Sequence, residues 1–110
     1  MSTTAVGKEA ESHVADYLQQ HHHKVLVQNW RTKWCEIDIV STKKHTVYFT
    51  EVKYRSTSNW GSGLEYITDA KLRKMRFAAE LWIAQHAWKG QACLQAAELD
   101  ALGKISVIEI

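Results

Sequence analysis

The longest strand-like run, 46-TVYFTEVKY-54, constrains the fold of this chain more than any other segment. Side chains on a strand alternate between two faces, so Val47, Phe49, Glu51 and Lys53 are predicted to share one face. An acid and a base at the end of an apolar face cost free energy unless they are paired or bind a metal. The run therefore predicts a buried strand that ends in a polar site.

Two shorter runs before it also have the composition of strands, 24-KVLVQNW-30 and 36-EIDIVS-41. In the second of these, Ile37 and Ile39 are predicted to share one face, opposite Asp38. The joint 42-TKKH-45 is short and polar, which predicts an antiparallel hairpin between the second and third strands.

Helical patterns cover residues from about 4 to 21 and from 68 to about 88. Further strands are predicted near residues 92–98 and 104–110, although the first of these is rich in alanine and is equally compatible with a helix. The predicted order is helix, three strands, helix, then one or two strands. This order is typical of an α/β fold in which helices flank a mixed sheet.

The length of the chain, 110 residues, allows one domain over residues 1–110 and leaves no room for two. No apolar run approaches the length that spans a bilayer, and no signal peptide precedes the first helix, so we expect a cytoplasmic protein without membrane association. Cys35 and Cys93 have no metal-type spacing and are expected to be free thiols. The net charge of +2 decides little about partners.

Three acids stand where the pattern predicts burial or half-burial: Glu11, Asp38 and Glu51. Pairing across the hairpin would bring Asp38 and Glu51 onto neighbouring strands. Two close carboxylates favour a cation or a shared proton, and Mg²⁺ accepts one or two carboxylates together with phosphate oxygens and water. Lys53 could then orient the attacking water or stabilise charge on a phosphate.

A structural interpretation fits the same spacing. Glu51 and Lys53 could form an ion pair at an exposed strand end, while Asp38 caps a turn or pairs with Arg31. Partly buried charges also arise in structural networks, so spacing alone favours this interpretation over a metal site.

An acid on one strand followed by E-x-K on the next resembles the PD-(D/E)xK nucleases, here as Asp38 and 51-EVK-53. More narrowly, the chain resembles the YraN-type family of small, uncharacterised, restriction-endonuclease-like proteins. The matching residues run in order from Gly7 to Ala79 and include Glu11, Ala15, 29-NWR-31, 36-EIDIV-40, 51-EVKYR-55, Gly61, Thr68, Ala70 and Lys71. Four residues depart from the family pattern: Ala10 and Cys35 in place of glycine, Asp69 in place of proline, and Gln95 in place of aspartate.

The resemblance implies a restriction-endonuclease-like core, similar also to archaeal Holliday-junction resolvases, but it supplies no proven substrate. Our leading hypothesis is a metal-dependent endonuclease, for which we expect DNA as a substrate before RNA. Carried over to this chain, Asp38 and Glu51 would bind Mg²⁺ or Mn²⁺, with the Val52 carbonyl and Glu11 as further ligands. Lys53 would serve the water or the phosphate. By the same resemblance, Lys71 would face the site.

Basic and aromatic residues near these motifs are candidates for contacts to nucleic acid, with phosphates or with bases. The candidates are Arg31, Arg55, Lys71, Arg73, Lys74 and Trp60. For Trp34, both packing within the fold and contact with nucleic acid remain open interpretations.

Two other classes of function remain alternatives: a non-catalytic DNA-binding or DNA-processing accessory module, and a protein-interaction domain. A symmetric homodimer would be a natural way for so small a protein to address two strands.

Overall fold

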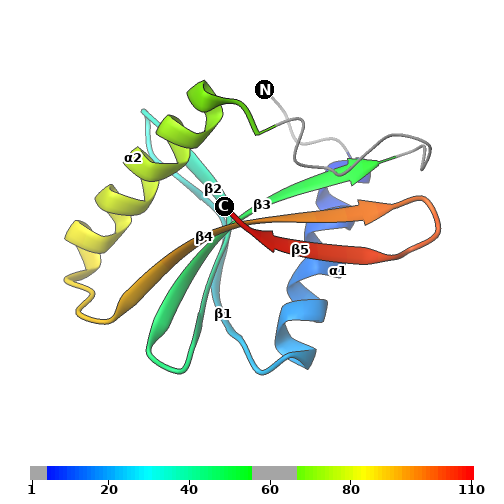
Figure 1. The fold of residues 1–110 in the computed structure, drawn as a ribbon, viewed down its shortest axis with the longest axis horizontal. Helices are drawn as coiled ribbons and strands as arrows, with labels where there is room; N and C mark the ends of the chain where they lie inside the picture. The colour runs from blue at the N-terminus through cyan, green and yellow to red at the C-terminus, as the bar shows by residue number, and fades with distance from the viewer. Residues whose placement is uncertain (1–4, 56–66) are drawn as a thin grey trace.

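The structure, a computed structural model, describes residues 5–55 and 67–110, and it confirms the predicted order of elements (Figure 1). The alanine-rich segment is a strand rather than a helix, and both predicted strands of the tail are present. The elements are α1 (Ala5–Gln20), β1 (Lys24–Arg31), β2 (Glu36–Lys43), β3 (Thr46–Arg55), α2 (Asp69–His86), β4 (Gln91–Asp100) and β5 (Ile105–Glu109).

The five strands form one mixed sheet in the order β1-β2-β3-β4-β5. β2 and β3 form the predicted antiparallel hairpin, whose turn residues Lys44 and His45 have φ values of 49° and 66°. Positive φ at both central residues is typical of the tight turns that match the twist of a hairpin. β3 pairs in parallel with β4 after the crossover through α2, and β5 returns antiparallel to β4.

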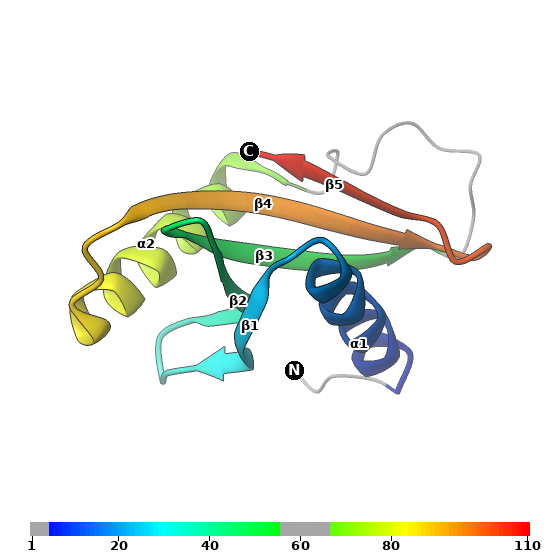
Figure 2. The ribbon, with the colours of Figure 1, turned by 90° about the horizontal axis from the view of Figure 1, so that it is seen from below.

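The two helices cover opposite faces of the sheet and lie toward opposite ends of the long strands (Figure 2). Along β3, Val47 and Phe49 pack in the cluster of α2, whereas Val52 packs in the cluster of α1. The buried residues of the α2 cluster are Ile37, Val40, Val47, Phe49, Ala78, Ala79 and Trp82, and those of the α1 cluster are Val14, Ala15, Leu18, Ile39 and Ala97.

β2 and β3 separate before either strand ends, and we call the gap between them the fork. Their pairing runs from the turn to Ile39 and Thr50, and the remaining residues of β2 pair with β1 alone among the described strands. The predicted alternation of β2 is wrong here, because Ile37 packs in the α2 cluster and Ile39 in the α1 cluster. The change of face falls at Asp38, between Ile37 and Ile39, which pair with Trp30 and Gln28 on either side of Asn29. Asn29 has a φ of 56°, and the bulge of β1 lies farther along the strand, between Val25 and Val27.

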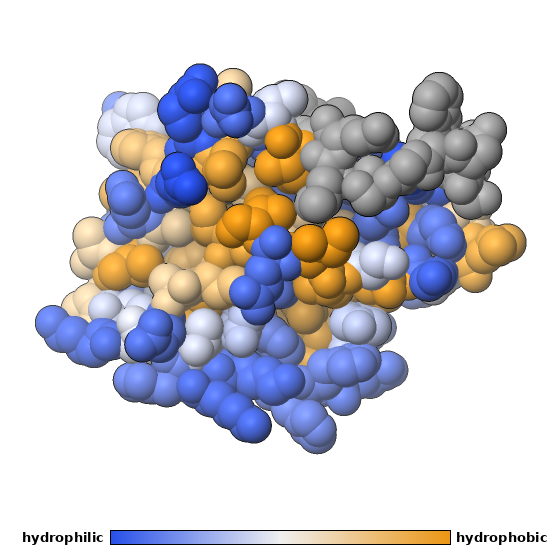
Figure 3. Space-filling view, viewed as in Figure 1, coloured by the Kyte–Doolittle hydropathy of each residue, from blue (hydrophilic) through white to orange (hydrophobic). Residues whose placement is uncertain are grey.

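The face shown in Figure 3 carries apolar side chains across its middle, over β4 and β5, and polar side chains along its lower edge. A partly apolar surface is ordinary for a folded protein. No helix within the described ranges, 5–55 and 67–110, is long and apolar enough to cross a membrane.

Candidate active site at the fork

Asp38 lies in the fork and is held by the backbone of the neighbouring strand. Its Oδ2 accepts a hydrogen bond of 2.8 Å from the backbone N–H of Val52. Because Val52 stands in the middle of 51-EVK-53, this bond places the Asp38 carboxyl beside Glu51. The two acids therefore lie close together, as predicted, at the point where β2 and β3 separate.

Two carboxyl groups near the fork are poorly solvated. Burial, together with repulsion from Glu51, raises the pKa of Asp38 to about 7, although the hydrogen bond from Val52 opposes the change. Burial also raises the pKa of Glu11 above its ordinary value, against a hydrogen bond from Asn29. Glu11 Oε1 is buried and has no hydrogen-bond partner among the described residues. The negative charge of these carboxyl groups is therefore only partly compensated by neighbouring hydrogen-bond donors.

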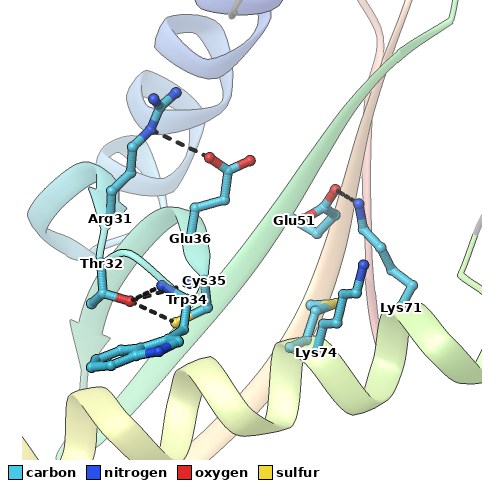
Figure 4. Close-up of a pocket in the computed structure, with 9 residues that line it drawn as sticks. Arg31, Thr32, Trp34, Cys35, Glu36, Glu51, Lys71 and Lys74 are labelled. Carbon is cyan, nitrogen blue, oxygen red and sulfur yellow. Dashed lines mark hydrogen bonds and ion pairs between the residues drawn. The ribbon is translucent and has the colours of Figure 1, made fainter. Parts of the chain in front are cut away.

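Lys71 brings positive charge to the fork from the first turn of α2. The hydroxyl of Thr68 accepts a 3.1 Å hydrogen bond from the Lys71 N–H and so caps this helix. The Lys71 Nζ then lies 2.7 Å from Glu51 Oε2 (Figure 4). Burial alone would lower the pKa of Lys71, but the hydrogen bond and charge of Glu51 outweigh it and raise that pKa. The structure thus places Lys71 where the family resemblance implies it.

A cavity of about 470 Å³ opens beside Glu51. Figure 4 shows Arg31 and Glu36 on one wall, with Glu51 and Lys71 on the other. The lining residues are Arg31, Thr32, Trp34, Cys35, Glu36, Glu51, Lys71, Lys74 and Met75. Glu36 is a cavity residue that was not among the predicted site residues, although it begins the 36-EIDIV-40 motif. Its charge raises the pKa of both Asp38 and Glu11.

The other predicted residues lie at varying distances from this cavity. Lys53 is exposed, stands opposite Glu98 of β4, and does not line the cavity. The Arg55 Nε lies 3.0 Å from Glu98 Oε2, so that guanidinium already has an internal partner. Arg73 lines a second cavity next to the first. Trp60 and Gly61 lie outside the described residues.

The four departures from the family pattern have different surroundings. Gln95 is buried and donates a 2.9 Å hydrogen bond to Thr50 Oγ1, so it fills a core position rather than the cavity. Cys35 forms part of the cavity wall, with its Sγ 3.4 Å from Thr32 Oγ1. Ala10 is buried in α1, and Asp69 begins α2.

The chemistry of the donors in the fork fits a hard divalent cation. Asp38, Glu51 and the backbone oxygen of Val52 offer only oxygen ligands, and Glu11 Oε1 is a further buried oxygen without a hydrogen-bond partner among the described residues. Within the described ranges, no three His, Cys, Asp or Glu side chains are grouped closely enough to hold a metal ion, so Asp38, Glu51 and Glu11 do not form a three-carboxylate site. Mg²⁺ takes one or two protein carboxylates and completes its shell with water and phosphate oxygens, so Asp38 and Glu51 alone would be enough for it.

The electrostatic link between Asp38 and Glu51 gives a direct prediction. Replacing Glu51 by glutamine removes the larger of the repulsive charges on Asp38, so the pKa of Asp38 should fall by roughly one pH unit. Glu36→Gln should lower that pKa less, because the charge of Glu36 contributes less. NMR titration of the Asp38 carboxyl carbon measures both effects. Glu80→Gln, on the exposed side of α2, is the control and should leave the pKa unchanged.

Comparison with known protein families places this chain in one of them. Residues 10–110 match the profile of UPF0102, described as an uncharacterised protein family. The chain belongs to the UPF0102 family. A UPF0102 protein of Pseudomonas fluorescens is 39% identical over 88 residues, which cover 79% of this chain and 72% of that protein. A UPF0102 protein of Vibrio parahaemolyticus is 38% identical over 84 residues, with coverages of 76% and 69%. Family membership confirms the YraN-type resemblance, and the family name specifies no activity.

Proposed function

We propose that this UPF0102 chain is a divalent-metal-dependent nuclease that hydrolyses phosphodiester bonds in DNA, including branched or otherwise structured DNA. The observation that carries the proposal is the hydrogen bond from the Val52 N–H to Asp38, which holds one carboxyl beside Glu51. Glu51 lines the cavity, whereas Asp38 lies behind it and is not among its lining residues. Two neighbouring acids beside a cavity support the proposal, because they could bind the divalent ion that metal-assisted phosphodiester hydrolysis uses.

In this proposal Asp38 and Glu51 hold Mg²⁺ or Mn²⁺, and the Val52 carbonyl and Glu11 support it. The N–H and C=O of one strand residue point to the same neighbouring strand, so the Val52 carbonyl shares the fork with its N–H. A bound divalent ion supplies Lewis-acid chemistry, lowering the pKa of water and neutralising phosphate charge.

The lysines act on the phosphate. Lys71, now paired with Glu51, exchanges that carboxylate for a phosphate oxygen when substrate enters, and Lys74 lies on the same cavity wall. Lys53 orients the attacking water or stabilises developing charge at the outer end of the fork. A cytoplasmic location suits an enzyme of this kind, and a symmetric homodimer would present one cavity to each strand.

Cleavage assays on a panel of substrates test the proposal. Labelled duplex, single-strand, flap and four-way junction DNA are incubated with the protein in Mg²⁺, in Mn²⁺ and in EDTA. We expect at least one substrate to be cut with either metal and none to be cut in EDTA, because the fork supplies too little positive charge without the ion. Intact DNA throughout the panel, at protein concentrations that bind it, would refute the nuclease.

The ion pair between Lys71 and Glu51 favours a second candidate, a non-catalytic DNA-binding module that retains the nuclease fold. In such a module the ammonium of Lys71 would permanently neutralise an acid that otherwise binds metal. The two functions differ in their response to Mg²⁺. A metal ion that binds the folded state raises the melting temperature of a nuclease, whereas it leaves the accessory module unchanged.

A further inference from the structure

Trp34 is an unusually exposed aromatic residue, with 67% of its surface accessible. A short turn between β1 and β2 fixes its position. The Thr32 N–H donates a 2.9 Å hydrogen bond to the Cys35 carbonyl, and the Thr32 hydroxyl accepts bonds from the N–H groups of Trp34 and Cys35. The Lys33 Nζ lies 5.1 Å from the centroid of the indole. The ring is therefore presented to solvent by an ordered backbone.

A second cavity, of about 280 Å³, lies between this turn and α2. Phe77 lines it from the helix and is itself 49% exposed, so two large aromatic side chains border one hollow. This volume is below the roughly 300–1,000 Å³ of sites that enclose whole small-molecule ligands. The hollow therefore suits one planar ring system with the rest of its molecule outside.

The charge around this second cavity is positive. Arg73 and Lys74 line it, and none of its described lining residues is acidic. Trp34, Cys35 and Lys74 also line the first cavity, so the two hollows are adjacent. A ligand that occupies both would place a planar group near Trp34 and an anionic group between the hollow and the fork. A strand of nucleic acid has this combination of flat bases and phosphates.

We propose that Trp34 and Phe77 receive an unpaired base of the DNA strand whose backbone runs into the fork. The inference rests on the proposed nuclease function and adds a substrate class to it, namely DNA with a single-stranded segment beside the cleaved bond. A base can stack on an aromatic side chain only when its face is free, and in a continuous duplex neighbouring bases cover both faces. An apolar protein segment would fill the hollow but would leave Arg73 and Lys74 without anionic partners.

Binding measured without cleavage tests this inference separately from the nuclease activity. Fluorescence anisotropy in EDTA follows a labelled single-stranded oligonucleotide of thymidines and a duplex of equal length. We expect Trp34→Ala to weaken binding of the single strand by about 5- to 100-fold, the range for loss of one base–aromatic stack, and to change duplex binding by less than about 2-fold. Phe77→Ala should act in the same direction, and Trp34→Phe should restore most of the affinity.

Oligonucleotides that carry abasic sites identify stacking as the cause. When bases are removed from the bound segment, wild type should lose affinity and the loss caused by Trp34→Ala should disappear. The matched control is Leu102→Ala, which truncates an apolar residue that is 87% exposed on the turn between β4 and β5 and should leave binding unchanged. Equal losses on single strand and duplex, or an abasic strand that still responds to Trp34→Ala, would overturn the inference. Absence of cleavage in Mg²⁺ with these binding results intact would refute the nuclease alone.

Discussion

Replacing Asp38 by asparagine is expected to abolish cleavage while making the folded chain more stable at pH 8. Asparagine keeps an oxygen that can accept the hydrogen bond from Val52, so the local geometry is retained. It removes the negative charge that the proposed metal site needs, and the rate should fall on the order of 10³-fold. A gain in stability with a loss of activity is the expected result when a buried charge is kept for function.

The pH dependence of the free energy of unfolding follows from the direction in which folding changes the pKa of Asp38. The pKa of Asp38 rises from 3.8 to about 7 on folding, so between these values the folded chain binds more protons than the unfolded chain. The contribution of Asp38 to stability is therefore present at low pH and is lost as the pH rises toward 7. The difference between the two pKa values corresponds to a loss of roughly 4 kcal/mol at most in metal-free solution. Asp38→Asn avoids this cost.

Urea unfolding of wild type and Asp38→Asn in EDTA, at pH 4 and at pH 8, measures the effect. The two proteins should have similar free energies of unfolding at pH 4, and the variant should be the more stable at pH 8. Asp100→Asn is the matched control, because Asp100 also accepts backbone hydrogen bonds, from Leu102 and Lys104, but lies far along β4 at a turn. A variant at position 38 that is less stable than wild type at pH 8 would show that the charge serves the fold.

Replacing Phe49 by alanine is expected to lower the free energy of unfolding by about 3–5 kcal/mol. Phe49 is 1% exposed and packs edge-to-face on Trp82, with ring centroids 5.6 Å apart. Its removal leaves a cavity between β3 and α2, the two elements that carry Glu51 and Lys71. For a domain of this size the melting temperature should fall by more than about 10 °C.

Thermal unfolding followed by circular dichroism measures this loss. Phe77→Ala removes the same side chain from a half-exposed position on α2 and should lower the free energy of unfolding by only roughly 1 kcal/mol. A cost below about 1 kcal/mol for Phe49→Ala would mean that the sheet and α2 can close the cavity, in contrast to the tight packing described here.

Local sequence patterns were sufficient to predict the helices and strands and part of the candidate site. Periodicity placed Glu11 on the buried edge of α1 and Phe49 in the core of β3, and both are buried. The hairpin between β2 and β3 followed from a short polar joint, and it accounts for the proximity of Asp38 to the segment that contains Glu51. Thr68 was expected to begin α2, and its hydroxyl caps that helix.

The finer geometry of the site was decided by pairings between distant segments. Ile37 and Ile39 pack in different clusters, and the neighbouring β1 residue Asn29 has a positive φ; no alternation pattern contains that information. Arg55 meets Glu98 only because β3 and β4 pair in parallel. Lys53, a candidate from its place in E-x-K, lies outside the cavity that Glu36 helps to line.

The order of helices and strands and the candidate acids follow from local periodicity and short motifs, which can be read along the chain. Three features depend instead on the packed fold: β2 and β3 part at Asp38, Lys71 reaches Glu51, and Trp34 and Phe77 border one cavity. These contacts join segments far apart in the chain. Their geometry depends on sheet pairing and helix packing, which the residues of any one segment do not specify.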